Sequence, residues 1–150
     1  MRLSNLSLAV WLLLLGLGTF ANAADDLKVV VLDSKTGHSL RGKLVCITFP
    51  SSEPVVEKPR ACQRTDSTGT AAFSLPDPAP EKVDVALSTN GLVPCFSPHT
   101  FVIADAIKIG LVARNTCGDA TTDTTETGEL VVYGHQKGIK ETLNSSRNEF

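Results

Sequence analysis

The sequence predicts an all-β fold, a β-sandwich stabilised by disulfides and preceded by a cleavable export signal. Apolar residues recur at every second position in several runs, which is the pattern of half-buried strands. Residues that favour tight turns separate these runs, and no run carries a sustained helical period. The chain also contains four cysteines, an even number that indicates two disulfides in an exported protein.

The first 23 residues have the features of a secretory signal peptide. Arg2 supplies a positive start, and the apolar segment from Leu8 to Phe20 is about 13 residues long, shorter than the roughly 20 of a membrane-spanning helix. Small residues at Ala21 and Ala23 fit a cleavage site. We expect cleavage after Ala23, with Ala24 as the nearest alternative, which leaves 127 of the 150 residues. The product is then exported, to the periplasm or outside the cell.

Residues 24–117 are expected to form the sandwich domain. Tight turns with Asp first and Gly last lie at Asp33–Gly37 and Asp66–Gly69. The alternating apolar residues lie around these turns: Leu27, Val29 and Val31; Val45, Ile47 and Phe49; Ala71, Phe73 and Leu75; Val83, Val85 and Leu87; Phe101 and Ile103; Ile107, Ile109 and Leu111.

The composition changes after Cys117. Residues 118–128 are rich in Thr and acidic residues and contain no large apolar side chain, so they are predicted to be a flexible linker. Residues 129–150 form a predicted tail, with one further strand at Glu129–Tyr133 and a short helix that Ile139 and Leu143 would allow.

The disulfide pairing can be predicted from the sequence positions of the cysteines. In an antiparallel hairpin, the position numbers of any two facing residues add up to the same sum. Cys46 and Cys62 centre on Pro54, between two candidate strands, and Cys95 and Cys117 centre on Ala106. We therefore expect Cys46–Cys62 and Cys95–Cys117, each stabilising the fold by about 3 kcal/mol. The main alternative is Cys46–Cys117 with Cys62–Cys95, if the two hairpins lie in different sheets.

Several residues resemble a known group of domains. Val30 to Asp33, Thr36-Gly37, Leu40 to Gly42 and Val45 are spaced as at the start of transthyretin-like and carboxypeptidase-regulatory-like domains, which are Ig-like in architecture. Thr65 to Gly69 and Ala72 to Leu75 resemble their next hairpin. The resemblance covers about residues 27–113 and implies a seven-stranded antiparallel sandwich. It also implies a generally non-catalytic module of an exported protein.

Two activities found among such domains do not fit this chain. Hydroxyisourate hydrolases carry a His at the V-L-D segment, where this chain has Val31 preceded by Val30, so no imidazole is present to activate water. Surface repeats that form an internal Lys–Asn amide place their Lys two residues before the turn Asp, which is again Val31. Lys28 lies on the same segment but its side chain would point to the opposite face.

Metal ions, cofactors and nucleic acids are not expected as ligands. Without its signal the chain has 13 basic and 16 acidic residues and no basic stripe, which disfavours a nucleic-acid partner. The cysteines contain no C-x-x-C pair, so a zinc site is disfavoured. Asp33 and Asp66 each stand alone in a turn, too few oxygens for calcium. No apolar stretch after the signal is long enough to span a membrane.

The function predicted from the sequence is a non-enzymatic module for protein–protein contact or envelope architecture. We expect the contact to form through the tail strand that contains Val131, added to an exposed sheet edge. The sandwich would contain no Trp or Tyr, which argues against carbohydrate binding. A small secreted hydrolase, or an accessory subunit of one, is the alternative, and it requires His38, His99 or His135 to converge with other titratable groups. A small-ligand carrier would need an apolar cavity open to solvent.

Overall fold

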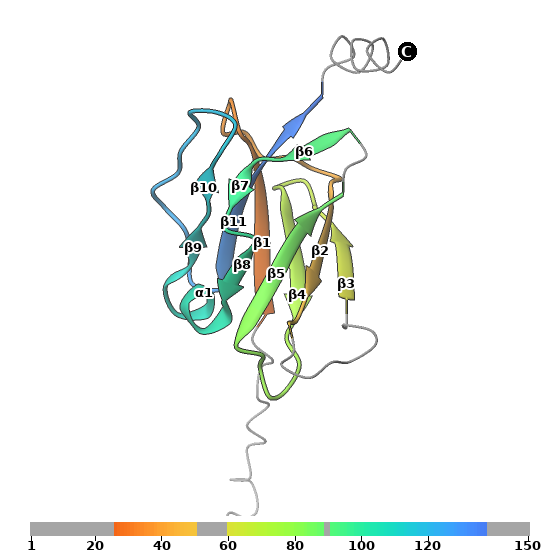
Figure 1. Cartoon of the computed structure of the whole chain (residues 1–150), viewed down its shortest axis with the longest axis vertical. Coiled ribbons are helices and arrows are strands. Elements are labelled where there is room, and N and C mark those ends of the chain that lie inside the picture. Colours follow the sequence, from red (N-terminus) through yellow and green to blue (C-terminus); the bar gives the residue numbers. More distant parts are fainter. Residues whose placement is uncertain (1–25, 51–59, 89–90, 138–150) are drawn as a thin grey trace, which may run out of the picture.

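The computed structural model describes residues 26–50, 60–88 and 91–137, and its regular elements are nearly all strands (Figure 1). The predicted all-β class is confirmed. These residues contain eleven strands and one helix rather than seven strands, and five of the strands have only two or three residues. In chain order the elements are β1 (Asp26–Asp33), β2 (Leu44–Thr48), β3 (Arg60–Arg64), β4 (Thr70–Ser74), β5 (Lys82–Leu87), β6 (Leu92–Pro94), β7 (Phe96–Ser97), β8 (Thr100–Val102), α1 (Ile103–Ile109), β9 (Leu111–Val112), β10 (Arg114–Asn115) and β11 (Glu129–Gln136).

Two larger sheets enclose a common core. One has the order β4-β1-β11-β6, with β9 also paired to β11, and the other has the order β3-β2-β5-β8. A small third sheet pairs β7 with β10. The alternating apolar residues predicted for β1, β2, β4 and β5 supply much of the core, as Val29, Ile47 and Val85 illustrate. Period-two patterning therefore identified these four strands correctly.

Strand β11 lies inside its sheet, which corrects the expected tail. It pairs in parallel with β1 from Lys28↔Glu129 to Asp33↔Gly134, and its other edge pairs with β9 and β6. Leu130 to Gly134 are all buried. The strand is thus predicted correctly, but the sandwich does not end at Cys117. The expected exposed edge at Val131 is also wrong, because Val131 is flanked by strands on both sides.

The segment 118–128, expected to be a flexible linker, contacts the sheet. The Asn115 side-chain amide donates to the carbonyl oxygens of Ser34 and Ala120, at 2.7 and 2.9 Å. Farther along, the Thr122 backbone N–H donates to the Tyr133 hydroxyl at 3.1 Å. Tyr133 is 1% exposed, so it belongs to the core rather than to a tail. The polar composition of this segment therefore reflects its own exposed side chains rather than a lack of contacts.

Helix α1 replaces part of a predicted hairpin. The alternation of Ile107, Ile109 and Leu111 predicts a strand, but residues 103–109 are helical. Ile103 and Ala106 are buried and Ile107 is half-buried, a helical spacing. Ile109 points away and is 63% exposed. No helix within the described residues is long and apolar enough to cross a membrane. The predicted signal peptide and C-terminal helix lie outside these residues.

Both predicted disulfides are present. Cys46 and Cys62 face each other across β2 and β3, with Cα atoms 4.0 Å apart, as the hairpin argument requires. Cys95 and Cys117 are also bonded, at a Cα separation of 5.3 Å. Here the reason differs from a simple hairpin, because β8, α1 and β9 lie between the paired strands β7 and β10. The pairing near Cys95 is nevertheless antiparallel, so the constant-sum argument holds to within one residue.

Candidate functional site

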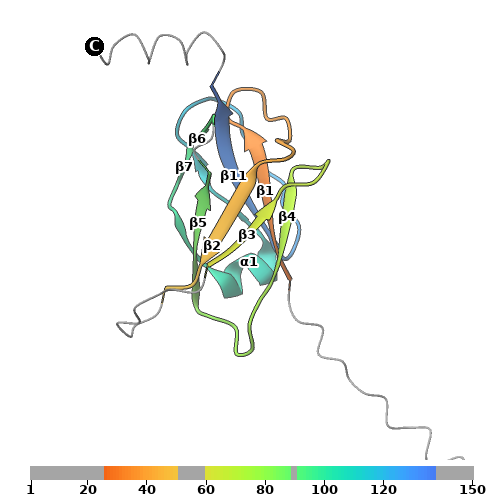
Figure 2. The same ribbon diagram turned by 90° about the vertical axis from the view of Figure 1, so that its right-hand side faces the viewer.

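Strand β3 is the most exposed strand of the structure and ends its sheet. It pairs with β2 alone, and all five of its residues are exposed. Figure 2 looks toward the side of the molecule on which β3 lies. The edge is continuous with the core because β2, on its other side, buries Val45 and Ile47. An edge strand of this kind presents unpaired backbone groups to another chain.

The register shows which backbone groups of β3 point outward. The Thr65 N–H donates to the Lys43 carbonyl, and the Ser88 N–H donates to the Leu44 carbonyl. Residues 43, 45 and 47 therefore direct their backbone groups toward β3, since these groups alternate along a strand. Their partners on β3 are residues 61 and 63, followed by Thr65. The N–H and C=O groups of Arg60, Cys62 and Arg64 consequently point away from β2.

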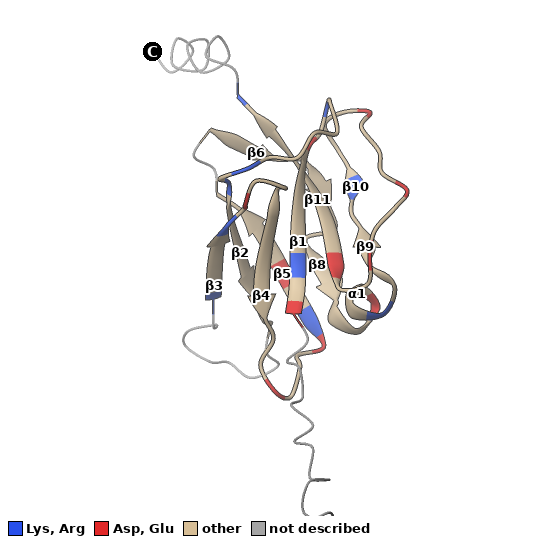
Figure 3. Ribbon diagram, turned by 180° about the vertical axis from the view of Figure 1, so that it is seen from behind, with Lys and Arg blue, Asp and Glu red and all other residues tan. Residues whose placement is uncertain are grey.

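The β3 edge is basic. Arg60 and Arg64 lie at its two ends, and residues 41–43 lie beside its C-terminal end because the Gly42 N–H donates to the Thr65 carbonyl. This segment adds Arg41, whereas the Lys43 ammonium donates to Gln136 Oε1 of β11, in the other sheet, at 3.0 Å. Figure 3 shows basic positions along β3, with acidic positions along the segment before and into β11 on the opposite side of the molecule. The strands β4, β6 and β8, which also end sheets, contain no charged residue.

A disulfide and a group of hydrogen bonds hold the β3 edge in place. The Cys46–Cys62 disulfide joins its central residue to β2. At its end, Thr65 is 4% exposed and its hydroxyl donates to the Leu40 carbonyl at 2.6 Å and accepts from the Lys43 N–H at 2.9 Å. The Arg64 guanidinium also donates to the Gly42 carbonyl at 3.0 Å. These contacts attach the extended edge to β2 and to residues 40–43.

A second group of polar residues lies where β1 ends. His135 Nδ1 of β11 is 3.9 Å from Asp33 Oδ2. The other carboxylate oxygen of Asp33 accepts from the N–H groups of Lys35 and Thr36 and from the Thr36 hydroxyl, at 2.9–3.0 Å. Asp33 therefore holds its own turn together, as the sequence predicted.

The pKa of Asp33 reflects these contacts. Partial burial raises the pKa of the carboxyl, but the Thr36 and Lys35 N–H groups oppose this effect. The Thr36 hydroxyl and the nearby His135 lower the pKa further, and the net pKa lies below the usual value. In the exposed Asp66 turn, the Thr68 hydroxyl and the N–H groups of Thr70 and Thr68 likewise lower the pKa of the Asp66 carboxyl.

The three histidines are in different environments. His135 is beside Asp33, so two titratable side chains do converge there. The His99 ring instead packs edge-on against Phe96, with ring centroids 4.8 Å apart. His38 is exposed, and its backbone carbonyl accepts from the Asp33 N–H. Among the described residues, no group of three His, Cys, Asp or Glu side chains is placed to hold a metal ion.

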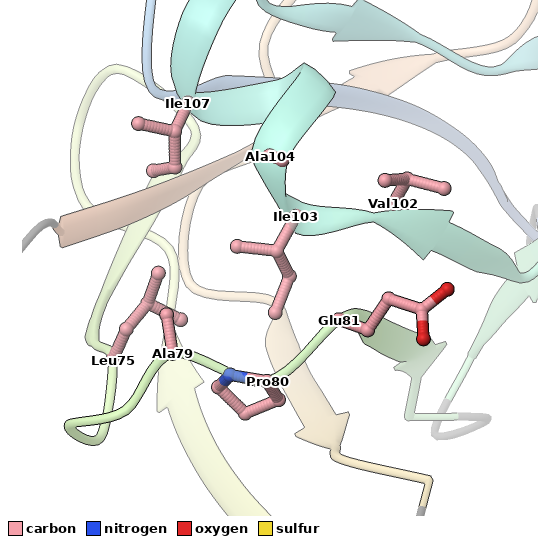
Figure 4. A pocket seen from close by; sticks show the side chains of 8 residues that line it. All are labelled: Leu75, Ala79, Pro80, Glu81, Val102, Ile103, Ala104 and Ile107. Carbon is pink, nitrogen blue, oxygen red and sulfur yellow. The ribbon is translucent and has the colours of Figure 1, made fainter.

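An apolar recess of about 430 Å³ lies beside α1. Leu75 and Ala79, from the segment after β4, lie across from Ile103 and Ile107 of the helix (Figure 4). Glu81 is the one charged residue of its lining, and Figure 4 shows its carboxylate directed away from Ile103 and Leu75. The recess therefore has the size and apolar lining of a small-ligand site.

Comparison with protein-family models, with curated proteins and with solved structures gives no match for this chain. The resemblance to transthyretin-like domains therefore stays a prediction.

The sequence predicted the disulfide cysteines but not the β3 edge. The segment Arg60–Arg64 has no alternating apolar residues because both of its faces are exposed, so period-two patterning could not find it. The signal that was available is Cys62 itself. A cysteine that faces Cys46 across a hairpin requires a strand around residue 62, and that strand is flanked by arginines.

Proposed function

We propose that this chain is an exported, non-catalytic β-sandwich module that acts by protein–protein contact through the β3 edge. The observation that carries the proposal is an extended strand, exposed at every residue and paired on one side only, that a disulfide holds in place. An edge held in this way loses little conformational entropy when it binds an extended chain. The two disulfides fit an oxidising compartment, which supports a periplasmic or extracellular location.

The environment of Asp33 supports a non-catalytic role. A catalytic carboxylate that orients a histidine would direct its hydrogen-bonding capacity toward that histidine. In this chain three hydrogen bonds reach Oδ1 from the Asp33 turn itself, and the distance from Oδ2 to the imidazole is 3.9 Å. The carboxylate is therefore used to shape the turn, and the hydrolase alternative has less support than the contact module.

Site-specific cross-linking in the native cell tests the proposal. A photoreactive residue at Arg64 should cross-link a defined segment of one protein, identified by mass spectrometry. The same residue at Arg114, which is exposed on β10, is the matched control and should not cross-link that segment. The variant Arg60→Pro should abolish the Arg64 cross-link. The Arg60 N–H points outward, and proline has no N–H with which to pair to an added strand. Equal cross-linking from both positions, or none from Arg64, would reject the β3 edge as the contact surface.

The apolar recess beside α1 supports a second candidate, a carrier of a small, neutral, apolar ligand. The recess is lined almost entirely by aliphatic side chains, which favour such a ligand. A neutral apolar dye such as Nile red should show increased fluorescence with the wild-type chain. The variant Ala104→Trp, which fills the recess, should lose that increase, whereas Ile109→Ser should retain it. Equal dye fluorescence with both variants would contradict the carrier.

A further inference from the structure

We infer that the β3 edge binds an extended acidic segment of its partner as an added strand, with two partner carboxylates four residues apart. The inference rests on the proposed function, because it names the chemistry of the partner at the same edge. It follows from the direction of the backbone groups, from the charges at the two ends of β3 and from the spacing between them.

The backbone provides the first part of the argument. Arg60, Cys62 and Arg64 direct their N–H and C=O groups outward, and these groups recur at the two-residue spacing of a strand ladder. An extended chain laid along β3 can therefore pair with successive groups without any rearrangement of the sheet. A helix cannot satisfy them, because its own backbone groups are already bonded.

The charges provide the second part. Residues 60, 62 and 64 also share one face of the sheet, on which Cys62 bonds to Cys46. Their side chains thus form a line with an arginine at each end and the disulfide in the middle. Arg41, which is exposed, adds a positive charge beyond the C-terminal end. Two carboxylates lie near this line, and each already accepts hydrogen bonds. Asp84 of β5 is in line with Arg60 across Thr48 and accepts from the Thr100 hydroxyl at 2.6 Å. The Asp66 oxygen Oδ1 is bonded within its own turn.

The spacing specifies the partner. Side chains of paired strands that share a face stand opposite each other at every second residue. A partner strand therefore meets Arg60 and Arg64 with residues j and j+4, and meets the disulfide with residue j+2. Carboxylates at j and j+4 complete two ion pairs, and a small residue at j+2 leaves room for the disulfide. Carboxylates two residues apart on the other face would point away from both arginines.

The arginines also have an alternative explanation. Charged residues on an edge strand are a common protection against unwanted pairing with other strands. A purely protective role predicts that the double variant Arg60→Ser, Arg64→Ser associates with itself through the edge, and that no acidic strand binds the wild type. The two explanations therefore differ in a measurable outcome.

Binding of designed peptides to the secreted, disulfide-bonded chain tests the inference. The probe is the capped peptide Thr-Glu-Val-Ser-Val-Glu-Thr, which places Glu at j and j+4 and Ser at j+2. The first control peptide replaces both Glu with Gln, and the second, Thr-Val-Glu-Ser-Glu-Val-Thr, moves them to the opposite face. We expect the probe to bind on the order of tenfold more tightly than either control, with an affinity that falls as salt is raised.

Charge reversal keeps the test independent of folding. The double variant Arg60→Glu, Arg64→Glu should lose the probe and instead bind the peptide with Lys at the same two positions. The variant Arg114→Glu is the matched control and should bind the probe as the wild type does. Isotope-edited infrared spectra of the bound probe should show the amide I shift of a strand added to a sheet.

Three results would overturn the inference. These are equal binding of the Gln peptide, the absence of probe binding at millimolar concentration, and binding without the strand signal. The proposed function fails separately. If Arg64 cross-links a partner segment that lacks the acidic pattern, the contact function holds and this inference is wrong. If Arg64 cross-links nothing, both fail.

Discussion

At the scale of single residues, Asp33 connects the turn, the sheet and the pH dependence of stability. Its carboxylate accepts three hydrogen bonds in the turn after β1 and lies near His135 of β11. Asp33 itself is half-buried. Because its pKa is lowered in the folded chain, the ionised form is the one that stabilises the fold.

The variant Asp33→Asn separates the charge from the shape of the turn. Asparagine keeps an oxygen acceptor for the turn but carries no charge, so we expect a loss of about 1 kcal/mol in the free energy of unfolding at neutral pH. A carboxyl whose pKa is lower in the folded chain stabilises the fold at any pH above its pKa in the unfolded chain. This stabilisation is lost as the pH falls through the pKa of the folded chain. The difference between wild type and variant should therefore shrink below about pH 4. Urea unfolding across pH measures it, with Asp123→Asn as an exposed control. A difference that stays constant with pH would contradict the charge effect.

At the scale of elements, the sequence predicted best those strands that bury one face. Val29 and Val85 alternate with exposed or half-buried neighbours, so period two found their strands. Strand β11 buries both faces of its centre, and its run Leu130-Val131-Val132-Tyr133 has no alternation. A continuous apolar run shows that a strand is buried but not which strands flank it. The pairing with β1 joins residues about a hundred positions apart, which local patterns do not encode.

The place of β11 in the sheet predicts where the chain can be shortened. Burial of Leu130, Val131, Val132 and Tyr133 contributes about 6–12 kcal/mol, comparable with the total stability of a small domain. A chain of residues 24–117 should therefore fail to fold, whereas a control of residues 24–137 should unfold cooperatively. Circular dichroism during urea unfolding, with mapping of both disulfides, measures the outcome. A cooperative transition in the 24–117 chain would show that β11 is dispensable.

At the scale of the whole molecule, the two disulfides have different tasks. Their loops span 16 and 22 residues, so the entropy that each removes from the unfolded chain differs by only about 0.3 kcal/mol. Their surroundings differ more. Cys95 lies in the core cluster and joins the β6–β7 junction to the end of β10. Cys46 and Cys62 lie on the outer face of their sheet and fasten the β3 edge.

This difference predicts that removing either disulfide destabilises the fold but that removing only one of them weakens binding at β3. Cys95→Ala with Cys117→Ala should lower the free energy of unfolding by about 3 kcal/mol from loop closure, plus about 1 kcal/mol from the space left in the core. It should leave binding at β3 unchanged, because neither cysteine touches that edge. Cys46→Ala with Cys62→Ala should cost about 3 kcal/mol and also weaken binding of the acidic probe, since a freed edge must be ordered when the peptide binds. Urea unfolding gives the free energy of unfolding of each double variant, and titration with the probe gives its affinity. If the Cys46–Cys62 variant binds the probe as tightly as the wild type, the disulfide does not prepare the edge for binding.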